Sequence, residues 1–579
     1  MTRLAAHLLA LLLMSSSAFA QGLPLPPPPG GLPGPPGVVR PAAPQAPRDA
    51  AAPRTGTARI RGRVVAADTG EPLRKAQVRA TSAELRENRL ATTDDKGVFE
   101  IKELPAGRFQ LTATKGSFVQ LQYGQTRPFE AGKPLEVADG QTIDKVEFSL
   151  PRGAIVTGRV VDEIGEPADG VQVSAMRYGY VQGRRQLVSS GRSGITNDIG
   201  EYRIFGVPPG QYYVSATLRT LNPFDVSSGD SSGYAPTFHP GTTNVAEAQR
   251  LTIELGQTRN GVDVVLSPVR LARITGTAVD SEGRPATGAL TVAMSQGQGG
   301  ISAYSGGQFR PDGSFTISNI APGSYTISAG SLGANLGGGP APDVISASVT
   351  VAGEDIQDLR LMGVKRSTVT GRVLLPQATP GAIRASTIQL TATPMQPSPI
   401  VTLTGSGATS RVNDDFTFEM RVAPGQQVIR LGGQPQGPTL KAVRINGTDV
   451  TDTGIDFRAS EDVSGVEVEL TTQVSELSGT VADARGRTVK DYSIVVFARD
   501  SARWTLGSRY FGNGRPDQDG RFKVRNLPPG DYYAIALDYV EPGAGTDPEF
   551  LEKIRDRATP FSMTEGGIQP LDLKLVSGL

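Results

Sequence analysis

The chain has 579 residues, more than one hydrophobic core usually organises, so we expect several domains. It carries 58 Lys and Arg against 57 Asp and Glu, and this balance gives no electrostatic case for nucleic acid or an anionic membrane surface. The absence of cysteine excludes disulfides, thiolate metal sites and cysteine nucleophiles. Glycine (70) and proline (44) make up about one residue in five, against an average near 12 %, so turns must be frequent.

The first 20 residues have the three parts of a secretory signal peptide. Arg3 precedes an apolar run over residues 4–14, and Ala18-Phe19-Ala20 supplies the small residues of a cleavage site. We predict cleavage between Ala20 and Gln21. The alternative, a membrane anchor, needs a longer run, because about 20 apolar residues are required to span a bilayer. The prediction is therefore an exported protein whose mature chain does not insert into a membrane.

Residues 21–56 form a proline-rich segment, with twelve prolines between Pro24 and Pro53. Such a segment cannot bury apolar side chains or pair its backbone donors, so we predict a disordered or polyproline-II linker. It is either a solvated spacer or a ligand for a proline-binding partner, and the composition favours the spacer.

One pattern then recurs five times. Each copy opens with a strand that contains a glycine, continues to a polar turn followed by an aromatic residue, and closes with an alternating strand such as VEFSL. Recurrence at intervals of about 100 residues indicates tandem repeats. The opening glycines are Gly62, Gly158, Gly276, Gly371 and Gly479. We predict five domains, called repeats 1 to 5 below: residues 57–151, 152–269, 270–364, 365–473 and 474–579.

Two turns in each repeat carry the pattern. The first turn has a glycine, either directly after Asp or one residue further on, as expected where the backbone needs a positive φ. These glycines are Gly97, Gly200, Gly313 and Gly520. The second turn has a later glycine (Gly107, Gly210, Gly323, Gly425 and Gly530), and in Pro209-Gly210 and Pro529-Gly530 we predict a type II turn. Repeat 4 has Asp415 where the spacing puts the first glycine, so we interpret it as degenerate.

The strands predict an all-β fold. Alternation at period two places Val146, Phe148 and Leu150 on one face, and turn signals every 8–12 residues are typical of antiparallel β-sandwiches. We assign to the cores the aromatics that follow the two turns: Phe99, Tyr202, Phe315, Phe522, Phe109, Tyr212, Tyr325 and Tyr532. The opening glycine allows a bulge or the close approach of one of these rings. Asp547, Pro548 and the apolar spacing after them predict a short helix.

The segments GRVVDEIGEPADGVQV and TNDIGEYRIFGVPPGQYYVSA of repeat 2 resemble the carboxypeptidase regulatory-like domain, a transthyretin-like (prealbumin-like) β-sandwich. The resemblance extends over residues 57–579 and is weaker in repeats 3 and 4. The resemblance implies a secreted bacterial protein with several copies of this domain. It also implies a fold that is grouped with carbohydrate-binding domains. It also implies partners of the kind this module accompanies, namely zinc carboxypeptidases and outer-membrane transporters.

The sequence contains few of the residues that common catalytic sites require. A zinc carboxypeptidase needs two histidine ligands and a carboxylate, and the predicted mature chain has only His239. No G-x-S-x-G motif accompanies that histidine. Asp517-x-Asp519-Gly520 could begin a calcium loop, but acids are lacking at the later ligand positions, so a plain turn is favoured. We predict no catalytic residues, no metal site and no cofactor.

Two insertions at equivalent places suggest ligand binding. MRYGYVQGRRQLV in repeat 2 and RDSARWTLGSRYFGNGR in repeat 5 combine aromatic rings, which stack on sugars, with arginines, which bind hydroxyls or carboxylates. The alternative is that the rings fold over their own sandwich. The candidate ligand-binding residues are Tyr178, Tyr180, Arg184, Arg185, Trp504, Arg509, Tyr510 and Phe511.

The sequence therefore predicts a non-catalytic, exported interaction protein, monomeric, with polysaccharide or an envelope protein as partner and no nucleic acid. It would lie in the periplasm, on the outer surface or outside the cell. Two alternatives remain open: a structural spacer or adhesin of the cell envelope, and an accessory to an outer-membrane transporter or a carboxypeptidase.

Overall fold

The computed structural model of the chain describes residues 56–85, 87–181, 183–218, 224, 232–294, 303–329, 343–375, 383–395, 408–432 and 438–578. The predicted signal peptide, with its cleavage site at Ala20 and Gln21, and the proline-rich linker up to residue 55 lie outside these residues, so both stay predictions.

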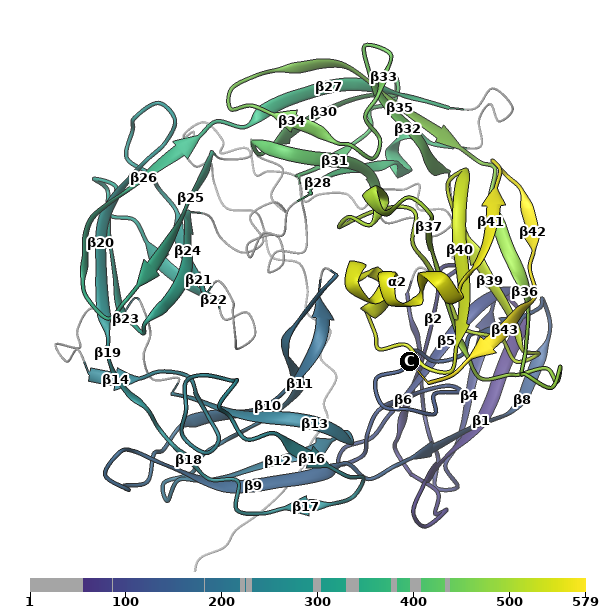
Figure 1. Ribbon diagram of the computed structural model, residues 1–579, viewed down its shortest axis with the longest axis horizontal. Coiled ribbons are helices and arrows are strands. Elements are labelled where there is room, and N and C mark those ends of the chain that lie inside the picture. Colours follow the sequence, from purple (N-terminus) through teal and green to yellow (C-terminus); the bar gives the residue numbers. More distant parts are fainter. Residues whose placement is uncertain are drawn as a thin grey trace, which may run out of the picture. The chain divides into compact units, whose positions relative to one another are not determined.

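Repeat 1 consists of two sheets (Figure 1). One sheet has the order β4-β1-β8, made of β4 (Val98–Leu104), β1 (Ala58–Ala66) and β8 (Thr142–Leu150). The other has the order β3-β2-β5-β6, with β7 also paired to β5: β3 (Arg89–Thr92), β2 (Gln77–Ser82), β5 (Gly107–Thr114), β6 (Leu121–Gln122) and β7 (Leu135–Val137).

Repeat 2 has the same two sheets and an added two-stranded ribbon. The first sheet comprises β12 (Glu201–Val207), β9 (Ala154–Val161), β17 (Thr258–Arg259) and β18 (Val264–Val265). The second comprises β11 (Arg184–Ile195), β10 (Val171–Val181), β13 (Gly210–Leu218), β15 (Thr237–Phe238) and β16 (Leu251–Ile253). The ribbon pairs β14 (Ser232–Tyr234) with β19 (Pro268–Arg270).

Repeats 3 and 4 follow the same plan. In repeat 3 the strands join in the order β22 (Ala303–Gln308), β21 (Ala289–Met294), β24 (Gly323–Ala329), β25 (Val344–Val351), β26 (Ile356–Val364), β20 (Ala272–Val279) and β23 (Ser314–Ile320). Repeat 4 has one sheet of β30 (Thr417–Val422), β27 (Ser367–Leu374), β35 (Val463–Thr471), β32 (Thr439–Ile445) and β33 (Thr448–Asp449). Its other sheet contains β29 (Ala408–Arg411), β28 (Gln389–Pro394), β31 (Gly425–Gly432) and β34 (Ile455–Phe457), beside a turn of 3-10 helix, η2 (Ala385–Thr387).

Repeat 5 adds short helices to the strands. Its strands are β36 (Glu476–Ala482), β37 (Ser493–Ala498), β38 (Gly512–Gly514), β39 (Arg521–Arg525), β40 (Gly530–Leu537), β41 (Thr559–Met563), β42 (Ile568–Pro570) and β43 (Leu573–Val576). Its helices are η3 (Ser501–Arg503), η4 (Ala544–Thr546), α2 (Pro548–Ile554) and η5 (Arg555–Arg557). The predicted short helix is thus confirmed as α2, with the Asp547 side chain accepting a hydrogen bond from the Phe550 N–H at its start.

The predicted all-β class of tandem β-sandwiches is confirmed, with one feature that alternation did not indicate. In every repeat the opening strand pairs in parallel with the closing strand, as β1 does with β8 and β27 with β35. Apart from β40 and β43 of repeat 5, which are also parallel, the other pairs within the sheets are antiparallel. Each sandwich is therefore held together between its own first and last strands. This pairing explains why both ends of the repeat pattern recur together.

The cores fall within the repeats. Among the described residues, five large clusters of buried apolar side chains lie at 58–150, 154–266, 272–361, 369–470 and 477–573, with a smaller one around Met176 and Phe238. The eight aromatics assigned to the cores are all buried, as predicted. Burial of such large rings dominates the stabilisation of a sandwich that lacks disulfides.

The opening glycine has no room for a side chain. A Cβ added at Gly62 would lie 1.9 Å from the carbonyl oxygen of Val146 and 2.7 Å from the ring of Phe99. The other four opening glycines would meet a carbonyl oxygen of the closing segment at 2.0–2.1 Å. The pairing of β1 with β8 also shifts register between Ile60 and Gly62. The predicted bulge and close ring approach are therefore confirmed.

The prediction of type II turns at Pro209-Gly210 and Pro529-Gly530 is wrong. The φ angles of Gly210 and Gly530 are 152° and 157°, not near 80°, and both glycines begin strands, β13 and β40. The left-handed residue lies four positions earlier, at Glu103, Gly206, Asn319 and Asn526, with φ of 57–73°. In repeats 1 to 3 the register between the opening strand and its neighbour shifts beside this residue. The bulge changes the direction of the chain before the Pro–Gly pair is reached, and the pair itself forms a bend at the start of the next strand.

Repeat 4 departs from the pattern differently from our interpretation. Phe416, not Asp415, occupies the place of the first glycine, with φ of 63°, whereas Gly97 has 72°. Phe418 pairs with Gly371 as Phe99 pairs with Gly62, so repeat 4 keeps an aromatic residue opposite its opening glycine. Compared with the other repeats, repeat 4 lacks one residue, namely the left-handed residue that precedes the second glycine. The ten-residue spacing counted back from Gly425 therefore identified Asp415 instead of Phe416 as the equivalent of the first glycine.

Candidate binding surfaces

The insertion of repeat 2 lengthens a β-hairpin. Strands β10 and β11 pair from Gln172 opposite Ile195 to Val181 opposite Arg184, so the candidate residues lie near its tip. The guanidinium of Arg185 lies 4.7 Å from the ring centroid of Tyr178, and this ring contacts Tyr213 edge-on at 5.9 Å. The structure thus brings Tyr178 and Arg185 together, while the side chain of Arg184 is exposed.

The hairpin tip approaches repeat 5. A Cβ added at Gly543 would lie 2.7 Å from the Cβ of Tyr180, and Arg177 lies 3.7 Å from the carboxylate of Glu541. Partial burial and the negative charge of Asp547 raise the pKa of Tyr180. Tyr180 is therefore half-buried against a neighbouring repeat and offers only part of its ring to a ligand.

Two of the aromatic candidates in repeat 5 fold onto their own sandwich. Trp504 is 8 % exposed, donates its indole N–H to the carbonyl of Ala498 at 2.8 Å and packs edge-on against Phe497. Tyr510 is 7 % exposed and its ring centroid lies 6.0 Å from that of Tyr532. Phe511 is partly buried against the same core. The rings are already packed, so little flat surface is left for a sugar.

Arg509 joins repeat 5 to repeat 4. Its Nε and Nη2 donate to the two carboxylate oxygens of Asp452 at 3.0 and 2.9 Å, and its Nη1 donates to the carbonyl of Leu440. Arg430 donates to the carbonyl of Thr451 on the same side, and burial lowers the pKa of Arg430 to about 10, so it is still charged at neutral pH. The arginine expected to bind a ligand is thus engaged by the protein itself.

A cleft that the sequence analysis did not predict lies between repeats 1 and 5, and we call it the 1–5 cleft. It has a volume of about 930 Å³ and is walled by β2, β5 and the β6–β7 connection of repeat 1 and by β37, β38 and residues 540–545 of repeat 5. Its polar lining side chains are Thr81, Ser82, Arg108, Gln110, Gln122, Glu130, Ser493, Asn513, Arg515 and Glu541. Asn513 and Arg515 lie in the repeat 5 insertion that the sequence analysis singled out, although neither was a candidate residue there. The other lining residues lie outside the two insertions, and no local signal joins those of repeat 1 to those of repeat 5.

A buried ion pair lies in the wall of the 1–5 cleft. Arg515 donates to Glu130 at 2.7 Å, and their side chains are 6 % and 2 % exposed. Arg515 also pairs with Asp491 at 2.9 Å. Burial favours the neutral form of Asp491, but the charges of Lys133 and Arg515 outweigh it and lower its pKa. The charges therefore offset one another, which favours a neutral, polar ligand over an ionic one.

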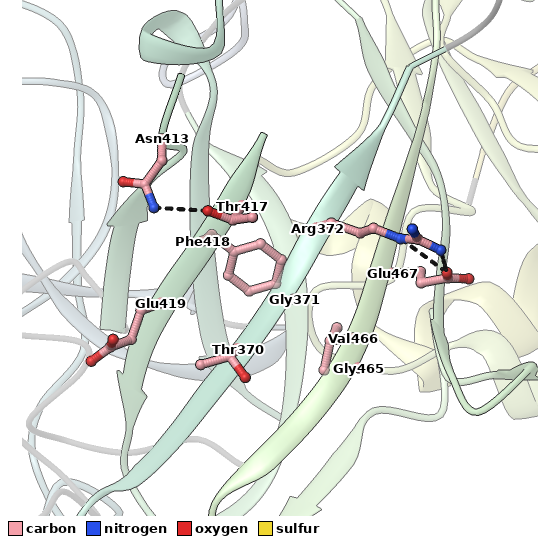
Figure 2. A pocket seen from close by; sticks show the side chains of 10 residues that line it. All are labelled: Thr370, Gly371, Arg372, Asn413, Thr417, Phe418, Glu419, Gly465, Val466 and Glu467. Carbon is pink, nitrogen blue, oxygen red and sulfur yellow. Dashed lines mark hydrogen bonds and ion pairs between the residues drawn. The ribbon is translucent and has the colours of Figure 1, made fainter. Parts of the chain in front are cut away.

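A second hollow lies on the sheet formed by β30, β27 and β35 of repeat 4 (Figure 2). It has a volume of about 510 Å³, with the Phe418 ring beside Gly371. Arg372 is paired with Glu467, and Asn413 donates to the hydroxyl of Thr417. Phe418 is 2 % exposed, so its ring gives a ligand little to contact. The 1–5 cleft is larger and carries more convergent polar groups, which makes it the better candidate.

The remaining sequence candidates have structural contacts. The ring Nδ1 of His239, which is buried, contacts the carbonyl of Asp263. The Asp517 carboxylate accepts hydrogen bonds from the backbone N–H groups of Asp519 and Arg521, as in a plain Asx turn. Within the described residues there is no cluster of three or more His, Asp or Glu suited to a metal ion. None of the helices in the described ranges combines the length and apolarity needed to cross a lipid bilayer.

The sheets and hydrophobic cores of the described residues define a tandem β-sandwich protein. Residues 59–151, within repeat 1, match the family model of the carboxypeptidase regulatory-like domain, which is the family that the sequence resembles. No curated protein matches this chain significantly.

Several solved bacterial structures are similar to parts of the chain. A streptococcal ancillary pilin is 13 % identical, covers 53 % of this chain and 98 % of its own, and has a TM-score of 0.19. The Bacillus anthracis TIE protein is 13 % identical, covers 71 % and 69 %, and has a TM-score of 0.15. Two B repeat units of the collagen binding protein of Staphylococcus aureus are 11 % identical, cover 72 % and 99 %, and have a TM-score of 0.12. Scores this low carry no argument about function.

Proposed function

We propose that this is an exported, non-catalytic interaction protein that binds carbohydrate in the 1–5 cleft. The observation that carries the proposal is the cleft itself, whose volume lies in the range of about 300–1,000 Å³ typical of small-molecule sites. An oligosaccharide presents hydroxyls that both donate and accept hydrogen bonds.

The side chains of the cleft suit such a ligand. The amides of Gln110 and Asn513 are exposed, and an amide donates and accepts in one plane. Glu541 in the repeat 5 wall adds an acceptor, and Arg108 in the repeat 1 wall adds a donor. Phe129 also lines the cleft, with the Arg177 guanidinium 3.8 Å from its ring centroid. The near-cancellation of charge in the wall favours a neutral saccharide.

The hairpin residues Tyr178, Tyr180, Arg184 and Arg185 form the second candidate surface. Arg184 is exposed and Arg185 lies over the ring of Tyr178, so an arginine–aromatic pair is available there. This surface supports the same ligand class but lacks an enclosed volume. It is therefore the alternative location within the same proposal.

Binding of the full mature chain to a panel of plant and microbial polysaccharides, followed by calorimetry with the best oligosaccharide, tests the proposal. We expect the double variant Gln110→Ala/Asn513→Ala to weaken binding at least tenfold. The matched control Gln249→Ala, an exposed amide in repeat 2, should leave binding unchanged. A loss with Tyr180→Ala/Arg184→Ala instead would move the site to the hairpin. If no saccharide binds, the carbohydrate proposal fails.

A further inference from the structure

The first and last repeats of the chain contact each other through charged groups. The pair Arg515–Glu130 joins residues 385 positions apart, and both side chains are almost fully buried at the contact. Around it, Asp491 of repeat 5 accepts from the hydroxyl of Thr126 at 3.1 Å and lies 3.3 Å from the Nζ of Lys133. These contacts are polar, as in interfaces between domains that open and close.

Each half of this contact is held in shape by its own repeat. In repeat 1, the second carboxylate oxygen of Glu130 accepts from the backbone N–H groups of Thr126 and Arg127. In repeat 5, the Arg515 guanidinium is held by Asp491 and by the carbonyl of Tyr492 at 3.0 Å. Both surfaces therefore keep their geometry when the contact opens, and both charges regain water rather than remaining buried and unpaired.

The two surfaces differ, and each is complementary in charge to the other. A contact between unlike surfaces within one chain can form equally between two chains, where the repeat 1 surface of each copy meets the repeat 5 surface of the other. The tether favours the intramolecular contact at low concentration, while high concentration favours exchange. We propose that the contact between repeats 1 and 5 is exchangeable and that two copies of this chain bind each other reciprocally through it. The proposal does not depend on carbohydrate binding.

Charge reversal tests this directly. Glu130→Arg leaves two arginines facing each other within one chain, and Arg515→Glu leaves two glutamates, so neither variant can close on itself. In an equimolar mixture, one native pair and one reversed pair can form between the two chains. We expect light scattering to show a species of twice the single-chain mass in the mixture, absent when either variant stands alone. Folded variants that remain at single-chain mass in the mixture would overturn the proposal.

A second measurement keeps the test valid if Glu130→Arg disturbs its loop. The chain contains no cysteine, so any disulfide that forms must join the introduced cysteines. We expect Thr126→Cys chains mixed with Asp491→Cys chains at high concentration to give a disulfide-linked heterodimer. The matched mixture of Ser281→Cys with Asp491→Cys, in which the first cysteine lies at an exposed position of repeat 3, should give several-fold less. Equal yields in the two mixtures would also overturn the proposal.

Discussion

The guanidinium of Arg509 forms two parallel hydrogen bonds with the carboxylate of Asp452, 57 residues earlier in the chain. Arg509 lies in the insertion of repeat 5, and Asp452 follows β33 of repeat 4. A planar guanidinium matches a carboxylate in this geometry, and such charge-assisted pairs are about twice as strong as neutral hydrogen bonds. The insertion therefore connects consecutive repeats.

Replacing Arg509 should destabilise repeat 5. Arg509→Lys keeps the charge but cannot form both hydrogen bonds, and we expect it to lower the free energy of unfolding by about 1–2 kcal/mol. The buried Trp504 is the only tryptophan of the chain, so its fluorescence during urea unfolding reports on repeat 5. The control is Arg499→Lys, because within the described part of the chain Arg499 forms no ion pair and its guanidinium lies 5.6 Å from the ring centroid of Tyr533. An equal loss in both variants would contradict a specific role of Arg509.

The same pair should make repeat 5 sensitive to acid. Burial favours the neutral form of Asp452, but the hydrogen bonds and charge of Arg509, together with the charge of Arg430, outweigh it and lower its pKa. A lowered pKa in the folded state gives stability that is present above the unfolded pKa, near 4, and is lost as the pH falls below it. We expect the urea midpoint reported by Trp504 to fall more between pH 5 and about pH 2.5 in the parent chain than in Asp452→Asn. Parallel curves would refute this origin.

The opening glycine should tolerate no side chain. In Gly62→Ala the new Cβ would overlap the carbonyl oxygen of Val146 and the ring of Phe99, so β1 and β8 must separate. We expect a loss of about 3 kcal/mol or more, the size associated with overpacked cores and strained backbone. Hydrogen exchange of peptides from β1 and β8 measures the local stability. Gly116→Ala is the matched control in the same repeat, because nothing lies within 4 Å of its added Cβ.

Two equivalent tyrosines should respond differently to loss of their hydroxyl. The hydroxyl of Tyr532 donates to the carbonyl of Pro528 at 2.6 Å, whereas that of Tyr212 is buried with no hydrogen-bond partner in the structure. Tyr532→Phe should cost about 1–2 kcal/mol, and Tyr212→Phe should be neutral or stabilising, because it removes an unsatisfied buried group. Hydrogen exchange of β40 and β13 measures the two effects. A similar loss at both positions would argue against this difference in pairing.

Local features of the sequence determined the sandwich. Alternating residues such as Val146, Phe148 and Leu150 are buried together because successive side chains of a strand point to opposite faces. Recurring glycines located the bulge beside the ring of Phe99, because only glycine fits there. The turns were less certain, since a left-handed residue such as Glu103 or Phe416 has no distinctive local signature.

Tertiary structure decided which residues of different repeats meet. The same aromatic and arginine composition in the repeat 5 insertion suits either an exposed sugar platform or a packed loop, and only the fold shows Trp504 buried and Arg509 paired with Asp452. The 1–5 cleft and the pair Arg515–Glu130 likewise combine residues 385 positions apart. Strand periodicity is set by neighbours along the chain, whereas these contacts are set by the packing of completed sandwiches, which no local pattern encodes.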